Sequence, residues 1–344
     1  MSKRRSMSVS AGVSVRVTMP TVLGLIGLWI SPIDAASNPP VPIGELPTAI
    51  ASFGAAIQGD WLYVLGGHVG RRHEHSTANL SDAFVRRKLH SAEPWETLPG
   101  SFPLQSVSLV SDGVRLYRVG GMTARNQPGE AEDLQSVDDV AAFDPRSLAW
   151  TPLPPLPSPR SSHDAVVIGG KLYVAGGWRL NGSPHDAEWL SSGYALDLKQ
   201  PDRWAPLPDA PFRRRAVAVA GSGNRLFVIG GIDEHGDVSR RVDILDLLRG
   251  EWSRGPDLPS SGFGASAFCT RGRLYVSGRS GVLHRLSGDE SEWESLATIS
   301  EPRIFHRMLS VGSDALLFLG GANRSGHLRG IEMLGLPVVS DPTP

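Results

Sequence analysis

Lys171-Leu172-Tyr173-Val174-Ala175-Gly176-Gly177 is a short apolar stretch that ends in two glycines, and it occurs six times in the chain. Close copies end at Gly66-Gly67, Gly120-Gly121 and Gly230-Gly231, and weaker copies end at Gly278 and at Gly320-Gly321. Branched and aromatic residues favour strands, and a glycine pair tolerates the positive φ of a tight turn. The stretch therefore predicts a repeated strand that ends in a turn. It specifies an architecture but no chemistry.

The spacing of a second residue supports the repeat. One tryptophan stands between each pair of consecutive copies: Trp95, Trp150, Trp204, Trp252 and Trp293. The distance from tryptophan to the next glycine is 25 to 27 residues, whereas the distance from glycine to the next tryptophan varies from 15 to 30. A constant half packs against its neighbours, and a variable half carries loops. A unit of about 50 residues is typical of one four-stranded propeller blade.

From about residue 40 to residue 337 the chain resembles the kelch-repeat β-propellers. The matching features are the glycine pair, the aromatic residue before it, the tryptophan, and the Phe143-Asp144-Pro145 and Leu-Pro elements near the tryptophan. The resemblance implies an all-β fold, a six-bladed kelch-type β-propeller. The 39 glycines and 27 prolines agree with this fold class, because both residues interrupt helices.

Four antiparallel strands are expected in each complete repeat. In the third repeat they are 163–168, 171–176, about 191–197 and 203–207, and the first lines the central channel. In the fifth repeat Arg279 replaces the second glycine, which predicts a different turn.

The two ends of the repeat region complement each other. Residues 41–46 look like the outermost strand of a blade, whereas 303–311, 315–319 and 329–334 look like three strands without a fourth. We therefore expect the ring to be closed by the N-terminal strand pairing with the C-terminal blade, which leaves no open edge.

The N-terminus resembles a secretory signal peptide. Basic residues from Lys3 to Arg16 precede an apolar run at 22–30, and small residues follow near Ala35. The predicted domains are a signal peptide at 1–35, the propeller at 36–337 and a C-terminal tail at 338–344. The apolar run is short for a membrane span. We therefore expect an exported protein, periplasmic or extracellular, with no membrane span after cleavage.

Composition removes other classes. The formal net charge of −1 gives no reason to expect nucleic acid as a partner. The single cysteine, Cys269, excludes an internal disulfide and is expected to be a small buried residue. We expect a monomer without a cofactor.

Cationic residues mark one face of the predicted propeller. Up-and-down topology places the long loops between second and third strands on the same face as the links between blades. The starts of the inner strands are rich in arginine and histidine: Arg160, His163, Arg214, Arg303, His306 and Arg307. Arginine presents a planar fork that suits carboxylate or phosphate. These residues either hold an acidic ligand or pair with acids of adjacent blades, and both interpretations remain open.

The long loops add further candidates for ligand binding. These are His68, Arg125, Asn126 and Trp178. A tryptophan beside a polar mouth suits the apolar face of a sugar, although it can equally cap the core of a blade. His68, His73 and His75 match no common zinc signature, so no metal is expected.

Two functional classes follow. The first is a binding module that presents its loop-rich face to a small acidic or neutral glycan, or to a protein partner. The second is an enzyme, because the chain resembles the exported N-acetylneuraminate epimerases in size and blade number. In such an enzyme Arg160, Arg214 and Arg307 would clamp the acid of a carboxylated sugar, and His163, His306 or Glu130 are the acid–base candidates. A copper oxidase of the galactose oxidase type is excluded, because Cys269 is predicted in an inner strand and no partner tyrosine is identifiable.

Overall fold

The computed structural model describes residues 39–100 and 102–337. The predicted signal peptide and C-terminal tail lie outside the described residues. The described residues form strands and two short 3-10 helices, Thr77–Asn79 and Pro184–Asp186, and they contain no α-helix. The predicted all-β fold class is confirmed.

Each repeat forms one four-stranded antiparallel sheet, here called a blade. From the innermost strand outward, blade one consists of β2 (Gly54–Gln58), β3 (Trp61–Leu65), β4 (Phe84–Lys88) and β5 (Glu96–Thr97). Blade two consists of β6 (Ser108–Ser111), β7 (Leu116–Val119), β10 (Val140–Asp144) and β11 (Ala149–Pro152). Blade three consists of β12 (Asp164–Ile168), β13 (Lys171–Ala175), β17 (Tyr194–Asp197) and β18 (Trp204–Pro206). The strands predicted in the third repeat are confirmed to within a few residues.

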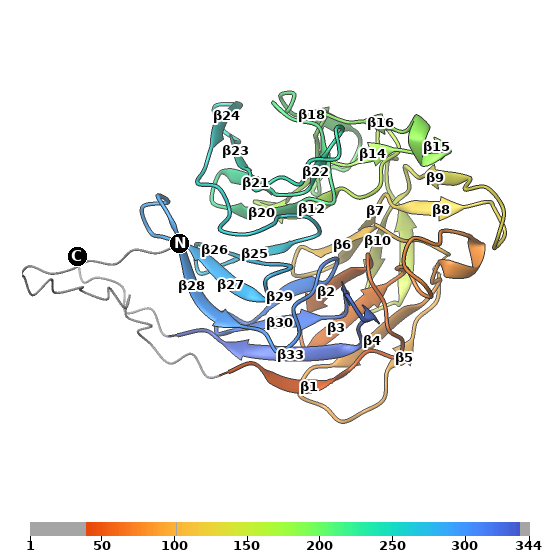
Figure 1. The fold of residues 1–344 in the computed structure, drawn as a ribbon, viewed down its shortest axis with the longest axis horizontal. Coiled ribbons are helices and arrows are strands. Elements are labelled where there is room, and N and C mark those ends of the chain that lie inside the picture. Colours follow the sequence, from red (N-terminus) through yellow and green to blue (C-terminus); the bar gives the residue numbers. More distant parts are fainter. Residues whose placement is uncertain (1–38, 101, 338–344) are drawn as a thin grey trace, which may run out of the picture. The chain divides into compact units, whose positions relative to one another are not determined.

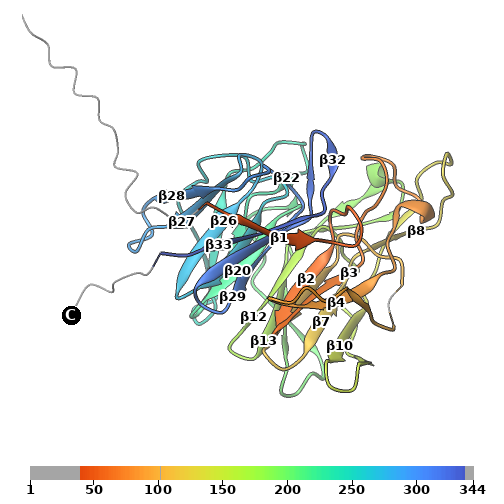
Figure 2. The ribbon, with the colours of Figure 1, turned by 90° about the horizontal axis from the view of Figure 1, so that it is seen from below.

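Blade four consists of β20 (Ala218–Ser222), β21 (Arg225–Ile229), β23 (Val242–Asp246) and β24 (Glu251–Arg254). Blade five consists of β25 (Ser266–Thr270), β26 (Arg273–Ser277), β27 (Val282–Leu286) and β28 (Trp293–Thr298). Blade six consists of β29 (Arg307–Val311), β30 (Ala315–Leu319), β33 (Gly330–Gly335) and β1 (Val41–Glu45). The sixth blade therefore takes its outer strand from the other end of the chain. Strand β1 pairs antiparallel with β33, from Val41 opposite Met333 to Glu45 opposite Gly330. Figures 1 and 2 both show the red β1 beside the blue β33.

A cyclic set of backbone hydrogen bonds joins the blades near the axis. Its members occupy equivalent positions, two residues before each inner strand: Ser52, Ser106, Ser162, Ala216, Gly264 and Phe305. Each N–H donates to the carbonyl of the equivalent residue in the preceding blade, over 2.6 to 3.3 Å, and the N–H of Ser52 donates to Phe305. All six have φ between +53° and +62°. We call this set the axial ring.

The glycine pairs and tryptophans hold adjacent blades together. Gly230 has φ +63°, and a Cβ at this position would lie 2.3 Å from the carbonyl oxygen of Gly262 in the link to the next blade. Each repeat tryptophan donates its indole N–H to a carbonyl in the outer part of the preceding blade, over 2.9 to 3.2 Å. In blade five, Gly278 lacks the positive φ of its counterparts, so the different turn predicted there is confirmed.

Small elements extend the loops between second and third strands. In blades two and three, β8 (Met122–Ala124), β9 (Leu134–Ser136) and β15 (Asn181–Gly182) form one sheet. Shorter pairs are β14 (Trp178–Arg179) with β16 (Glu188–Trp189), β19 (Arg214–Arg215) with β22 (Ile232–Asp233), and β31 (Ala322–Asn323) with β32 (Gly326–His327). In Figure 2, β8, β22 and β32 lie toward one side and the β12–β13 turn toward the other. The first side is the predicted loop-rich face.

Candidate functional site

A cavity of about 970 Å³ opens on the loop-rich face. Its floor includes four members of the axial ring, Ser52, Ser106, Ser162 and Phe305. Its walls come from the loops between second and third strands and from the links between blades. The short turns of the opposite face, such as Gly59-Asp60 and Gly169-Gly170, contribute nothing to it. The topology thus collects the variable segments around one hollow, as the sequence predicts.

The floor of the cavity has a polar side and an aromatic side. The serine hydroxyls belong to blades one to three, whereas Phe305 belongs to blade six. Its ring packs edge-on against Phe263, with ring centroids 5.1 Å apart. A hollow with hydroxyls on one side and aromatic faces on the other suits a ligand that is itself polar on one side and apolar on the other.

Three histidines meet where blade one faces blade six. The Nδ1 of His68 lies 3.1 Å from the Nε2 of His327, and the rings of His68 and His75 are 5.0 Å apart. The side-chain amide of Gln105 holds His75 at 3.0 Å. Burial lowers the pKa values of His75 and His327 to about 4. Both rings are therefore neutral at pH 7. Among the described residues, no group of three or more histidine, cysteine or acidic side chains is arranged to hold a metal ion.

Arg215 is a wall residue that the sequence interpretation missed. Its guanidinium lies 4.0 Å from the ring centroid of Trp178 and 5.5 Å from that of Trp189. Burial lowers its pKa to about 10. The available signal was alternation: successive residues of a strand point to opposite sides, so Arg214 and Arg215 cannot share one environment. Trp178, a predicted site residue, does line the cavity.

Three of the predicted arginines lie inside the blades. Arg160, Arg214 and Arg303 are at most 2% exposed. Each donates from Nη1 to the carbonyl of the first glycine in its own blade, at Gly176, Gly230 and Gly320. This placement favours the scaffold interpretation for them. The acidic partners of Arg214 and Arg303 come from the same blade, not from an adjacent one as that interpretation supposed.

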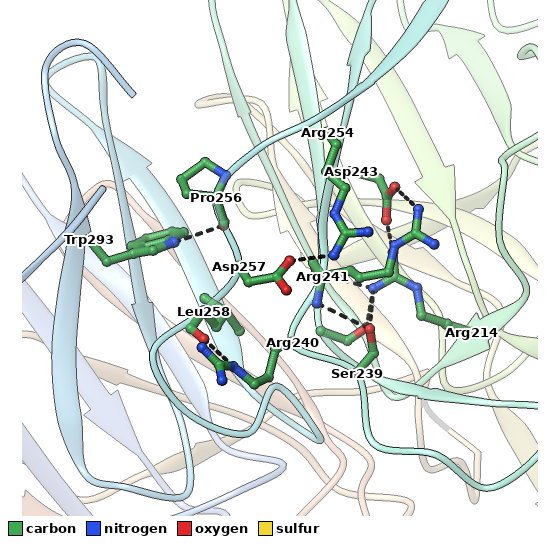
Figure 3. A network of polar contacts seen from close by, with 11 residues as sticks. Arg214, Ser239, Arg240, Arg241, Asp243, Arg254, Pro256, Asp257, Leu258 and Trp293 are labelled. Carbon is green, nitrogen blue, oxygen red and sulfur yellow. Dashed lines mark hydrogen bonds and ion pairs between the residues drawn. The ribbon is translucent and has the colours of Figure 1, made fainter. Parts of the chain in front are cut away.

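The acidic partner differs between blades. Asp243 pairs with Arg214 and also accepts from Arg241 at 2.7 Å, as Figure 3 shows, and Glu332 pairs with Arg303. Arg160 has no carboxylate. It donates to the carbonyl and the hydroxyl of Ser192, and its guanidinium lies 5.1 Å from the ring centroid of Tyr194, two residues further along the chain. Asp243 and Glu332 likewise stand two residues after the carbonyls that Arg214 and Arg303 bind in their blades. The bond from the arginine to the glycine carbonyl is therefore the same in the three blades, whereas the group that faces its positive charge differs.

Arg307 crosses the channel beneath the axial ring. It donates to the carbonyls of Phe53 and Val107 and to the carboxylate of Asp164, over 2.8 to 3.0 Å. Asp164 also accepts from the hydroxyl of Ser108 and the N–H of Val219. The side-chain nitrogens of Arg307 that bind these groups join blade six to blades one, two and three. It is a structural tie.

The catalytic candidates do not share the wall of the large cavity. His163 and His306 are 4% and 3% exposed and line a hollow of about 50 Å³ beneath the axial ring. Burial lowers both pKa values to about 3. Glu130 is exposed in the loop of blade two, where its carboxylate accepts from the N–H of Gln127. The structure therefore does not bring these three residues together.

The remaining loop candidates separate. Asn126 is buried, donates to the carbonyl of His75 at 2.8 Å and accepts from the N–H of Asp133. It supports the histidine loop from behind. Arg125 is exposed and does not line the cavity. His68 and Trp178 are the two loop candidates that line it.

Comparison with known proteins agrees with this architecture. The model of the KLHDC2/KLHL20/DRC7 Kelch-repeats domain matches residues 52–279, well over half of the chain. The chain belongs to the kelch-repeat family. This kelch-repeat chain is 29% identical over 201 residues to human Kelch-like protein 34, which covers 53% of the chain and 31% of that relative. It is also 29% identical over 229 residues to spermatocyte protein spe-26 of Caenorhabditis elegans, covering 66% of the chain and 37% of the relative.

A solved structure extends the match to the fold. "Structure of YjhT" aligns with this kelch-repeat chain at a TM-score of 0.68 and 18% identity, covering 86% of the chain and 97% of that structure. The likeness concerns the fold alone. The chain spans about a third of the length of the two curated relatives above. Among the described residues, no helix is long and apolar enough to cross a membrane.

Proposed function

We propose that this protein is an exported binding module that takes a small carbohydrate ligand into the cavity of its loop-rich face. The observation that carries the proposal is the cavity itself. Its volume of about 970 Å³ lies at the upper end of the range for small-molecule sites. Hydroxyls on the floor suit the hydroxyls of a sugar, and Phe263 and Phe305 offer aromatic surface to its apolar side.

A protein partner is the other binding class that the sequence leaves open. Specific protein interfaces are broad surfaces that bury about 800 Å² on each partner. A hollow enclosed by loops suits a small molecule better, or the end of a chain. We therefore favour a glycan, and a protein ligand is an outcome that the experiment can return.

The test fills the floor of the cavity. Ser106 and Phe305 are equivalent members of the axial ring and have the same φ of +53°. Ser106→Phe therefore keeps a backbone conformation that a phenylalanine already adopts. Calorimetric titration of a panel of neutral and acidic sugars first identifies a sugar that binds. We expect Ser106→Phe to weaken the binding of that sugar by about tenfold or more, because the phenylalanine ring occupies the space of the ligand.

The control lies on the opposite face. Lys171→Ala removes an exposed side chain beside the Gly169-Gly170 turn and should leave binding unchanged. Equal affinity of Ser106→Phe and the unchanged protein would contradict the proposed site. Binding of a protein, without binding of any sugar in the panel, would favour a protein ligand over a glycan.

Export rests on the sequence of residues 1–35. We propose cleavage near Ala35, which gives a periplasmic or extracellular protein. N-terminal sequencing of the mature protein tests this. A protein that keeps Met1 in the cytoplasm would contradict it.

An epimerase is the second candidate function, and the neutral histidines of the wall favour it. A neutral ring can accept a proton, and the cavity would hold the sugar beside it, although a pKa of about 4 makes each ring a weaker base than an ordinary histidine. His75 and His327 are then better candidates than His163, His306 and Glu130, because they line the cavity. An epimerase assay with His75→Gln and His327→Gln tests this, and unchanged turnover in both would exclude the two rings.

A further inference from the structure

Two successive arginines of β19 have opposite environments. Arg214 points into blade four, where Asp243 neutralises it. Arg215 points to the cavity, and no carboxylate of the described residues lies within ion-pair distance of it. The Nε of both arginines lacks a hydrogen-bond partner among the described residues, so the contrast between them lies in the charge. Arg214 has an ion-pair partner in this part of the chain and Arg215 has none.

Trp178 holds this unpaired cation in place. The guanidinium lies 4.0 Å from its ring centroid, and Trp178 in turn packs edge-on against Trp189 at 5.5 Å. A cation–π contact restricts the plane of the guanidinium but adds no negative charge. The indole N–H of Trp178 is itself buried without an acceptor. The arrangement orients Arg215 without neutralising it.

The lining of the cavity is cationic. Besides Arg215 it includes Arg72, Arg279 and Arg324, and also the buried Arg303, which Glu332 neutralises. Glu132 is the one carboxylate among the described lining residues. Burial is the main cause of the lowered pKa of His75, and the positive charge of Arg215 adds to it. An unpaired cation in a partly dry wall is unfavourable unless an anion compensates it.

We propose that Arg215, seated on Trp178, is an anion-binding subsite in the wall of this cavity that holds a carboxylate, sulfate or phosphate group of the ligand. The subsite rests on the proposed binding function and adds the chemical class of the group that is bound. The planar fork of Arg215 offers two parallel N–H donors to such an oxyanion.

The experiment compares Arg215→Met with Arg213→Met. Both variants remove one positive charge from the same segment, but Arg213 is exposed, pairs with Glu234 at 3.5 Å and does not line the cavity. The probes are sodium sulfate, sodium phosphate, glucuronate and glucose, titrated calorimetrically at constant ionic strength. Glucuronate and glucose differ in the carboxylate, and the inorganic anions report the subsite without a sugar.

We expect the unchanged protein and Arg213→Met to bind glucuronate about tenfold more tightly than glucose, the magnitude of a charge-assisted hydrogen-bonded pair. Arg215→Met should abolish that preference and any sulfate or phosphate binding, while its affinity for glucose stays the same. Arg215→Lys keeps the charge without the fork and should retain part of the preference. It also carries the test if the methionine variant does not fold.

The outcomes separate the two proposals. A preference for glucuronate that survives in Arg215→Met, or that is absent from the unchanged protein, overturns the anion-binding subsite. If glucose still binds, the proposed carbohydrate-binding function stands. Inorganic anion binding that depends on Arg215, without binding of either sugar, supports the subsite and removes the carbohydrate proposal. Failure of all four probes to bind the unchanged protein overturns both.

Discussion

Arginines at equivalent positions do structural work here through the same contacts. Arg160, Arg214 and Arg303 all bind the carbonyl of the first glycine of their blade. That carbonyl sits where the chain turns with positive φ, and the guanidinium satisfies a backbone acceptor that the strand ladder leaves over. The sequence interpretation identified these arginines at the starts of the inner strands, but a structural residue and a ligand residue can both stand at that position.

The presence or absence of a buried carboxylate beside each arginine predicts how strongly its methionine variant is destabilised. Arg303→Met removes the one cation that pairs with the buried Glu332 among the described residues, so we expect a loss of about 3–5 kcal/mol in the free energy of unfolding. Arg160→Met leaves only carbonyls and a hydroxyl without their donor, so we expect a smaller loss of about 1–3 kcal/mol. Denaturant unfolding of the two variants measures this. A larger loss for Arg160→Met would show that Tyr194 does more than replace a carboxylate.

The histidines predict a pH dependence. Burial lowers the folded-state pKa values of His75 and His327 to about 4, whereas the unfolded value is near 6.5. Above pH 6.5 both states are neutral and stability is unaffected. As the pH falls from 6.5 toward 4, the unfolded state takes up protons first, so stability declines. The contribution of these two rings levels off below pH 4, where His163 and His306, with pKa values of about 3, continue the decline.

The check is thermal unfolding between pH 7.5 and pH 4.5. His327→Gln removes one of the two titrating groups, so its melting temperature should fall less steeply over this interval. Identical slopes for this variant and the unchanged protein would show that the ring is already protonated or solvated when folded.

At the scale of elements, β1 completes a blade that the C-terminus leaves unfinished. The strand pairs with β33, and Leu46 directly after it is 1% exposed in the core between blades six and one. The sequence predicts this pairing, because residues 41–46 match the outer strand of other repeats. The register, and the irregularity between Pro42 and Gly44, follow only from the contacts with β33.

Deletion of residues 36–47 should therefore be strongly destabilising. It exposes the edge of β33 and removes Leu46, and burial of one such leucine contributes about 2–5 kcal/mol. We expect a melting temperature many degrees lower and a tendency to aggregate, measured by calorimetry and light scattering. Deletion of 338–344 is the control and should change little. Equal melting temperatures for both deletions would contradict the role of β1.

At the scale of the molecule, the blades are tied at the axis. The axial ring joins all six blades through their backbones, and Arg307 with Asp164 joins five through side chains and backbone groups. The two ties are stacked, one at the floor of the cavity and one beneath it. The base of the cavity is therefore formed by polar groups whose partners lie in different blades.

Arg307→Met tests this central tie. It leaves the carboxylate of Asp164, which is 7% exposed, without its cation, so we expect a loss of about 3–5 kcal/mol. Arg307→Lys keeps the charge but cannot reach both carbonyls and the carboxylate, so its loss should be intermediate. Denaturant unfolding ranks the three proteins. Equal stability of Arg307→Met and Arg307→Lys would show that the fork, not the charge, carries the tie.

The sequence by itself determined the strands, their order and the face that carries the loops. These follow from a short apolar strand, a glycine pair and a tryptophan, whose physical roles are local or repeat at a constant distance. It also located arginines and histidines near the mouth. Only the tertiary structure decided which of them face the cavity, because a one-residue step along a strand sends a side chain to the opposite side. Arg214 therefore belongs to the scaffold and Arg215 to the wall, although both have the same chemistry and adjacent numbers.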